Sequence, residues 1–193
     1  MKRNMLVLGL VLIAVAAVFI WNDRDDKSQQ SAGNAVVDVS LTDIPIKPEP
    51  KKNHYAPSFD LASLDGASTF QVGGKRDKAL IINFWAAWCG PCEVEAPDLK
   101  DIYEKHKDKL DLYAVNATKY DKLREAKDFV KEQGFVFPVL TDAKGDVGDL
   151  YKVFSYPISF IIDRNGVIRE RIEGVISREE WEMHLDGVLN SQQ

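Results

Sequence analysis

The chain contains two cysteines, and both lie in one short stretch, Cys89-Gly90-Pro91-Cys92. An apolar run before them predicts a buried strand, and the residues after them predict a helix, so Cys89 should stand at a helix amino terminus. Unpaired backbone N–H groups and the positive end of the helix dipole favour a thiolate there. Cys92 follows one helical turn later, where its sulfur can close a disulfide or resolve a mixed one. The spacing therefore indicates thiol–disulfide exchange.

Three other uses of the cysteine pair are less well supported. A structural disulfide across so short a loop would contribute only about 2 kcal/mol through chain entropy. A metal site would need two further ligands, and the three histidines, His54, His106 and His184, are not paired in the sequence. Covalent haem attachment requires a histidine directly after the second cysteine, where Glu93 stands. We therefore expect no metal and no cofactor beyond the redox-active disulfide.

Composition excludes other classes of protein. The 193 residues carry 25 Lys and Arg against 30 Asp and Glu, and this net charge of −5 argues against a nucleic-acid-binding surface. Hydrophobic residues make up 45% of the chain, which is enough for a packed core and excludes wholesale disorder. The length allows one globular domain with additional segments.

The amino terminus has the pattern of a membrane anchor. Residues 5–21 are almost wholly apolar, follow Lys2 and Arg3, and end at Trp21 before a polar, acidic stretch. As a helix this run would span about 25 Å, close to the ~30 Å of a bilayer core. A cleaved signal peptide is the alternative, although no small-x-small site marks the end of the run. The basic residues before the run place residues 1–4 in the cytoplasm and the rest of the chain outside.

The remaining chain divides into an extracytoplasmic linker, residues 22–53, and a domain, residues 54–193. Polar residues and three prolines dominate the linker, so it should extend rather than pack. The domain alternates strand and helix patterns. They predict, in chain order, a strand over 79–85, a helix from the cysteines to 106, a strand over 110–115, a helix over 123–130 ended by Gly134, a short strand at 139–140, a helical turn over 147–151, a hairpin of 159–162 with 167–172, and a helix over 177–189. This order predicts an α/β sandwich with a central mixed sheet flanked by helices.

The residues around the cysteines resemble a known fold family. The stretch Asn83-Phe84-Trp85-Ala86-Ala87-Trp88-Cys89-Gly90-Pro91-Cys92 is similar to the active-site strand and turn of thioredoxin-fold proteins. Pro97 matches the helix-kinking proline of that fold, and Tyr156-Pro157 matches the position of its cis-proline, which the resemblance places beside the disulfide. The resemblance covers residues 54–193 and implies a thioredoxin-like thiol–disulfide oxidoreductase.

Two positions narrow the resemblance to one branch. Thioredoxins carry a buried aspartate where this chain has Asn83, whereas Glu95 matches a glutamate of the membrane-anchored TlpA/ResA-like branch. That branch includes reductases of cytochrome c maturation and spore-envelope assembly, and it implies an amino-terminal hairpin, which residues 58–61 and 69–71 would fit. The alternative for Glu95 is a solvated helix face, as for its neighbour Glu93.

The resemblance implies a role for each site residue. Cys89 would attack a substrate disulfide, and Cys92 would expel the reduced substrate. Glu95 would assist proton movement around Cys92. Pro157 denies the substrate an N–H group while Tyr156 offers backbone groups for strand-like pairing. Trp88 would shape the rim of the site, although plain aromatic packing is the alternative.

The leading hypothesis is a membrane-anchored reductase on the extracytoplasmic side. The resemblance implies two partners, a disulfide-containing protein substrate such as apocytochrome c, and an integral membrane protein that supplies electrons. An oxidase or isomerase of secreted proteins is the alternative within the same class, and a non-catalytic redox-sensing module is the alternative outside it. Asn116-Ala117-Thr118 is formally a glycosylation sequon, but its position fits the end of a strand better.

Overall fold

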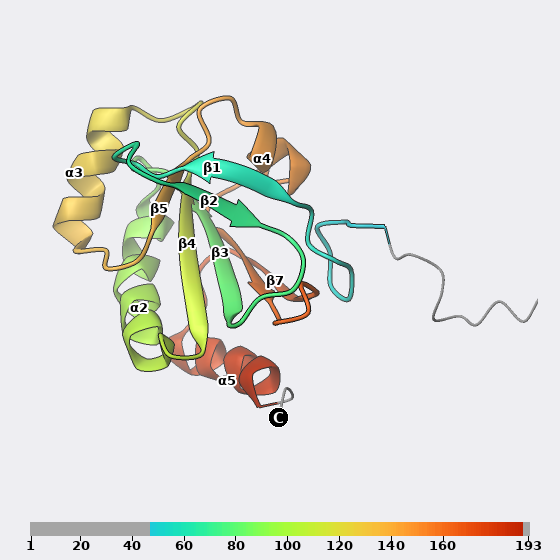
Figure 1. Ribbon diagram of the computed structural model, residues 1–193. Coiled ribbons are helices and arrows are strands. Elements are labelled where there is room, and N and C mark those ends of the chain that lie inside the picture. Colours follow the sequence, from blue (N-terminus) through green and yellow to red (C-terminus); the bar gives the residue numbers. More distant parts are fainter. Residues whose placement is uncertain (1–46, 191–193) are drawn as a thin grey trace, which may run out of the picture. The chain divides into compact units, whose positions relative to one another are not determined.

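The computed structural model describes residues 47–190 and contains a five-stranded mixed sheet with the strand order β5-β4-β3-β6-β7 (Figure 1). Strands β3 (Ala79–Trp85), β4 (Leu110–Asn116) and β5 (Val139–Thr141) are parallel. Strands β6 (Ile158–Ile162) and β7 (Ile168–Glu173) continue the sheet antiparallel. All seven residues of β3 are buried, as expected for the central strand.

Helices and a hairpin cover the two faces of this sheet. The helices are α2 (Gly90–His106), α3 (Leu123–Gln133), α4 (Asp146–Leu150) and α5 (Arg178–Leu189). A separate antiparallel hairpin, β1 (Phe59–Ala62) and β2 (Thr69–Val72), crosses in front of the sheet in Figure 1. The strands and helices predicted from the sequence are confirmed, as is the hairpin that the resemblance implies.

The alternation of side chains along β3 divides the core into two clusters. Ile81 and Trp85 point into the cluster formed with α2, α3 and α5. Leu80, Ile82 and Phe84 point into the other cluster, formed with the β1–β2 hairpin and α4. Because successive strand residues face opposite sides, the continuous apolar run of β3 fills both clusters. The central strand, and the turn that follows it, are therefore held from both faces.

Helix α3 ends and helix α5 begins where the sequence predicts. Gly134 follows α3 in the left-handed conformation, with φ of 63°, and donates its N–H to the carbonyl of Val130. Ser177 and Glu180 form a reciprocal capping box at the start of α5.

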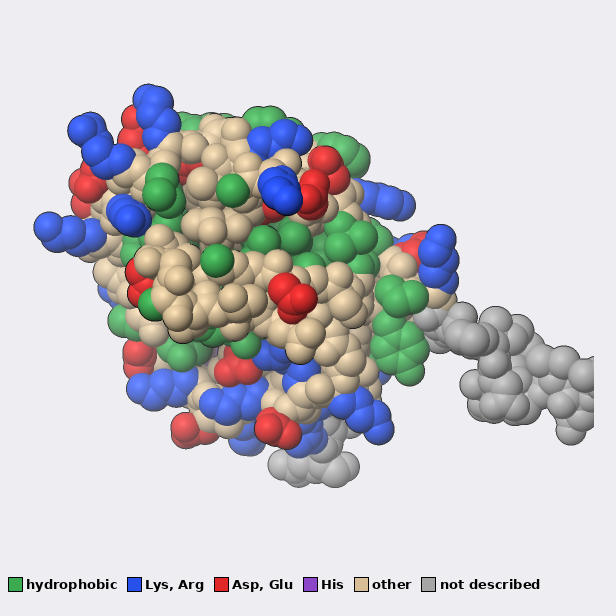
Figure 2. Space-filling view, turned by 45° about the horizontal axis from the view of Figure 1, so that its top comes forward, with side chains coloured by type: hydrophobic (Ala, Val, Ile, Leu, Met, Phe, Trp, Pro, Cys, Tyr) green, Lys and Arg blue, Asp and Glu red, His purple; other side chains and the backbone are tan. Residues whose placement is uncertain are grey.

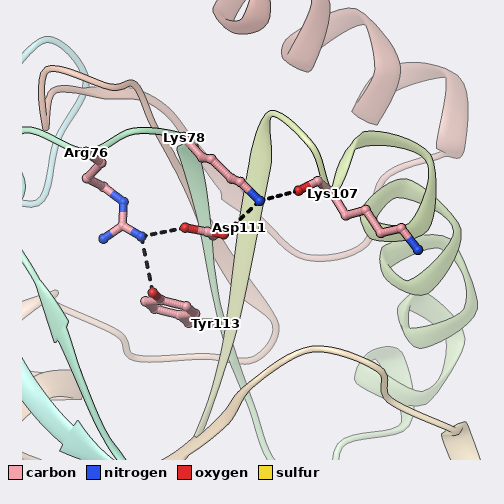
Figure 3. A network of polar contacts seen from close by, with 5 residues as sticks. All are labelled: Arg76, Lys78, Lys107, Asp111 and Tyr113. Carbon is pink, nitrogen blue, oxygen red and sulfur yellow. Dashed lines mark hydrogen bonds and ion pairs between the residues drawn. The ribbon is translucent and has the colours of Figure 1, made fainter.

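A network of charged and polar side chains lies near the start of β4 (Figure 3). Arg76 donates from Nη2 to the Asp111 carboxylate across 2.9 Å and to the Tyr113 hydroxyl across 3.2 Å. Lys78 donates to the carbonyl of Lys107 across 2.6 Å. These contacts tie the beginning of β4 to neighbouring loops, whereas the cysteines follow the opposite end of the parallel strand β3. The network therefore supports the sheet and is not part of the site.

Two predicted segments fall mostly or wholly outside the described residues. The anchor at 5–21 lies outside them, as does the linker up to residue 46. From Glu49 onward the chain is bonded to the domain, because Glu49 N–H donates to the carbonyl of Tyr55 and Asn53 N–H donates to the carbonyl of Ile168. Among residues 47–190, no helix is both long and apolar enough to cross a membrane.

Candidate active site

The two cysteines form a disulfide at the start of α2. Their Cα atoms are 5.3 Å apart, and both side chains are about 95% buried, with exposures of 5% for Cys89 and 4% for Cys92. Cys89 is the N-cap of the helix, and its sulfur accepts a hydrogen bond from the Cys92 N–H across 3.2 Å. A backbone donor and the amino end of a helix therefore face this sulfur, an arrangement that stabilises a thiolate once the disulfide is reduced.

Glu95 lies one helical turn after Cys92 and is buried, with 1% of its side chain exposed. Its Oε2 accepts a hydrogen bond from Asn83 Nδ2 across 2.9 Å, and Asn83 also bonds to the hydroxyl of Ser159. Its Oε1 is buried and has no hydrogen-bond partner among the described residues. Glu93, by contrast, is exposed. Glu95 is therefore not on a solvated helix face.

Burial raises the pKa of Glu95 from 4.5 to about 7, because desolvation penalises the charged carboxylate. The hydrogen bond from Asn83 opposes this change, and the nearby charge of Asp98 adds to it. A carboxyl group with this pKa can both accept and release a proton at neutral pH. Glu95 is thus chemically suited to proton transfer inside the protein.

Tyr156 and Pro157 are joined by a cis peptide bond directly before β6. Because Ile158 of β6 pairs with Phe84 of β3, this turn lies at the same end of the sheet as the cysteines. The ring of Tyr156 packs edge-to-face against Trp88, with centroids 5.7 Å apart. The structure therefore brings together the cysteine turn and the proline turn that the resemblance places beside it.

Trp88 forms part of the surface next to the disulfide. Its side chain is 58% exposed, and its indole N–H donates to the carbonyl of Tyr120 across 3.0 Å. A groove of about 390 Å³ begins here. Aromatic side chains line it together with a few charged ones, the main lining residues being Trp88, Tyr120, Phe154, Tyr156, Lys119, Asp142 and Asp149.

Two exposed aromatics of this groove were not foreseen from the sequence. Phe154 is 86% exposed and Tyr120 is 59% exposed. The position of Phe154, two residues before Tyr156-Pro157, was the available signal, since a large apolar side chain in a loop beside a redox site suggests contact with a partner. On the face shown in Figure 2, hydrophobic side chains lie exposed while most Lys and Arg side chains lie toward the margin.

A larger hollow, of about 610 Å³, lies between the β1–β2 hairpin, α3 and β5. Its lining includes Phe70, Phe137 and Lys127 but neither cysteine nor any histidine. The histidines lie elsewhere: His106 contacts the Glu182 carboxylate across 3.0 Å at the last turn of α2, far along the helix from the cysteines. Within residues 47–190, no three His, Cys, Asp or Glu side chains are grouped to hold a metal ion. The disulfide thus lies outside this hollow and apart from His106.

Comparison with known proteins finds relatives along most of the chain. The model of the AhpC/TSA family matches residues 53–171. Thiol-disulfide oxidoreductase ResA of Oceanobacillus iheyensis is 30% identical over an alignment of 197 positions, which covers 99% of this chain and 93% of ResA. Thioredoxin-like protein YneN of Bacillus subtilis is 35% identical, over 92% of this chain and 95% of YneN.

Solved structures give the same result. A putative thiol:disulfide interchange protein DsbE from Chlorobium tepidum superposes with a TM-score of 0.65 and 30% identity, over 72% of this chain and 98% of that one. StoA from Bacillus subtilis superposes with a TM-score of 0.59 and 26% identity, over 67% of this chain and 96% of StoA. The fold predicted from the resemblance, a thioredoxin-like sandwich around a mixed sheet, is therefore confirmed for the described residues.

Proposed function

This chain belongs to the AhpC/TSA family of thioredoxin-like proteins, and we propose that it is a membrane-anchored thiol–disulfide reductase working outside the cytoplasm. It is a thiol–disulfide oxidoreductase, as relatives such as ResA of Oceanobacillus iheyensis are named, and its cysteine pair fits this activity. The observation that carries the proposal is Cys89 at the N-cap of α2, with its sulfur bonded to the Cys92 N–H.

The proposed reaction starts from the reduced pair. The Cys89 thiolate attacks one sulfur of a substrate disulfide, a new S–S bond forms to Cys89, and the other substrate sulfur leaves as a thiolate. The Cys92 thiolate then attacks the Cys89 sulfur and expels the second substrate sulfur. Two electrons pass to the substrate, and the pair ends as the Cys89–Cys92 disulfide seen in the structure.

Glu95 would handle the proton of Cys92. Cys92 is buried, so its thiol needs a nearby proton acceptor before it can act as a nucleophile. The carboxyl of Glu95, one turn further along α2 and with a pKa of about 7, is suited to this task. Asn83 holds the carboxyl through its 2.9 Å hydrogen bond and occupies the position of the aspartate found in thioredoxins.

Trp88, Tyr156 and Pro157 would receive the substrate chain. Pro157 has no N–H, so an incoming strand meets only the backbone groups offered beside it by Tyr156. Trp88 and Tyr156 form an aromatic wall next to the cysteines, and this wall would cover the substrate segment around its own disulfide. No cofactor other than the cysteine pair enters this reaction.

The proposed location rests on the sequence. Residues 5–21 would anchor the protein as a single span, and residues 22–53 would hold the domain outside the membrane. The alignment with ResA of Oceanobacillus iheyensis extends over 99% of this chain and so includes these two segments, which supports the proposal that they belong to the same kind of protein. An integral membrane protein would re-reduce the pair, and apocytochrome c or another envelope protein would be the substrate.

Trapping the mixed disulfide tests this function. In cells producing the full chain, Cys92→Ser should accumulate adducts that dithiothreitol releases, because Cys89 is left joined to the substrate. Cys89→Ser is the matched control and should accumulate none. If Cys92→Ser traps nothing, a non-catalytic redox-sensing role replaces the reductase. If the unmodified protein is found mainly oxidised in cells, an oxidase or isomerase role is favoured instead.

A further inference from the structure

The loop between β4 and α3 is bonded directly to the turn that carries Cys89. Ala117 N–H donates to the carbonyl of Trp85, the last residue of β3. The carboxylate of Asp121 accepts the N–H of Ala87 across 2.6 Å. The indole N–H of Trp88 donates to Tyr120 across 3.0 Å. One contact thus joins this loop to the end of the central strand, and two join it to the short segment between that strand and the disulfide.

Asp121 is the side chain at the centre of these contacts. Its Oδ2 also accepts a hydrogen bond from Asn116 Nδ2 across 2.7 Å, and its Oδ1 accepts the N–H of Lys122 across 2.8 Å. Asn116 is fully buried at the end of β4, and its Oδ1 accepts the hydroxyl of Thr118 across 2.9 Å. The carboxylate is therefore fixed from the sheet and does not depend on solvent for its orientation.

The Asn116-Ala117-Thr118 stretch has a structural role here and is not a glycosylation site in the folded protein. Asn116 has no exposed surface, so its amide is not accessible to a modifying enzyme in the folded protein. Instead Asn116 orients Asp121, and Asp121 holds Ala87. Asn116 therefore lies at the end of a strand, as its position in the sequence predicted, and it is part of the support of the redox site.

The bond to Ala87 matters because β3 ends at Trp85, so the N–H of Ala87 lies beyond the described strand and bonds to Asp121 instead. A hydrogen bond from a backbone N–H to a carboxylate is charge-assisted and stronger than a neutral one. The Cys89 N–H bonds to the carbonyl of Ala86, so the position of this turn sets where the Cys89 sulfur lies relative to the start of α2. A small displacement of a reacting group lowers the rate of a reaction strongly.

We infer that Asp121 is a positioning residue for Cys89. It holds the turn at Ala87 so that the Cys89 sulfur faces the amino end of α2 and Trp88 stays against Tyr156. The inference deepens the proposed function and rests on it only for the identity of the nucleophile. It does not depend on the direction in which electrons flow.

The test compares Asp121→Ala with Asp121→Asn in the full chain. Asparagine removes the charge but keeps a carbonyl oxygen that can accept from Ala87 and Asn116, whereas alanine removes both the charge and the acceptor. In a Cys92→Ser background only one thiol remains, and the thiolate absorbance at 240 nm gives the pKa of Cys89 alone. We expect a higher Cys89 pKa in the alanine variant than in the asparagine variant, because only the former loosens the helix cap.

Exchange rates with both cysteines present provide the second readout. The Asp121→Ala variant should reduce a polypeptide disulfide at least about tenfold more slowly than the Asp121→Asn variant, because a small misplacement of a reacting group lowers the rate strongly. Asp128→Ala, at an exposed position of α3, removes a similar charge away from the site and should change neither readout. If both Asp121 variants lose thermal stability but share one Cys89 pKa and one rate, Asp121 is merely structural and the inference fails. An oxidising potential would refute the reductase assignment while leaving this comparison intact.

Discussion

Asn83 donates its side-chain amide to the Glu95 carboxylate across 2.9 Å, and this hydrogen bond joins the central strand to the cysteine-bearing helix inside the core. It lowers the pKa of Glu95 against the larger effect of burial. The second carboxylate oxygen stays without a hydrogen-bond partner among the described residues. Glu95 is therefore a buried acid with a hydrogen bond to only one of its two oxygens among the described residues, and its ionisation should affect both stability and reactivity.

The first prediction concerns stability and pH. Folded Glu95 keeps its proton up to about pH 7, whereas the unfolded carboxyl loses it near 4.5. The folded state therefore binds more protons between these values, and its stability should fall as the pH rises through that window. The shift corresponds to roughly 3 kcal/mol at most. Urea unfolding of Glu95→Gln should show a smaller loss of stability between pH 4.5 and pH 7 than the unmodified protein.

Glu93→Gln is the matched control for that experiment, since Glu93 is an exposed acid on the same helix. It should retain the pH dependence of the unmodified protein. An unchanged pH dependence in Glu95→Gln would show that Glu95 is already ionised in the folded state at low pH.

A second prediction concerns the rate of exchange. If Glu95 accepts the proton of Cys92, the rate at which the mixed disulfide is resolved should rise as the pH passes about 7. Glu95→Gln should lose this inflection and resolve the mixed disulfide about 10²-fold more slowly, the lower range for a lost general base. Stopped-flow measurements from pH 5 to pH 9 would check this. Retention of the inflection would assign it to another group.

Asn83→Ala provides a third prediction. The substitution removes the hydrogen bond that opposes desolvation, so the pKa of Glu95 should move above 7 and the inflection of the rate should move with it. The variant should also lose about 2 kcal/mol of stability, because the bonds from Asn83 to Glu95 and Ser159 are both lost. An inflection that stays in place would mean that Asn83 does not influence the group that produces it.

A fourth prediction concerns the aromatic wall. Trp88→Ala should cost about 1 kcal/mol of stability through the lost contact with Tyr156. It should lower kcat/KM for a polypeptide disulfide about fivefold, chiefly through KM, because substrate contact is lost while the cysteines are unchanged. Reduction of a small disulfide reagent should change less, because the bond from Ala87 to Asp121 still holds the Cys89 turn. Met183→Ala, at an exposed apolar position of α5, should affect neither substrate.

Much of this protein could be predicted from its sequence because its strongest patterns are local. The apolar run at β3, the helix stop at Gly134 and the capping box at Ser177 each act within a few residues, and the structure has all three. The burial of Glu95 also had a local signal. It lies four residues before Leu99 and seven before Ile102, on the face that packs into the core.

Other parts of the site depend on contacts between distant loops. The bond from Ala87 to Asp121 joins residues 34 positions apart, and no periodicity in either segment predicts it. Phe154 and Tyr120 come from two different loops, far apart in the sequence, that line the same groove in the folded chain. The sequence could therefore predict the cysteine pair at the start of a helix, whereas the residues that hold and surround this pair required the folded chain.

The reduction potential of the Cys89–Cys92 pair tests the central claim most directly. Equilibration of the full chain with dithiothreitol or glutathione buffers, followed by alkylation of free thiols, gives this potential. A reductase should have a value near that of thioredoxin, about −270 mV. A value approaching about −120 mV, that of a strong oxidant, would contradict the account.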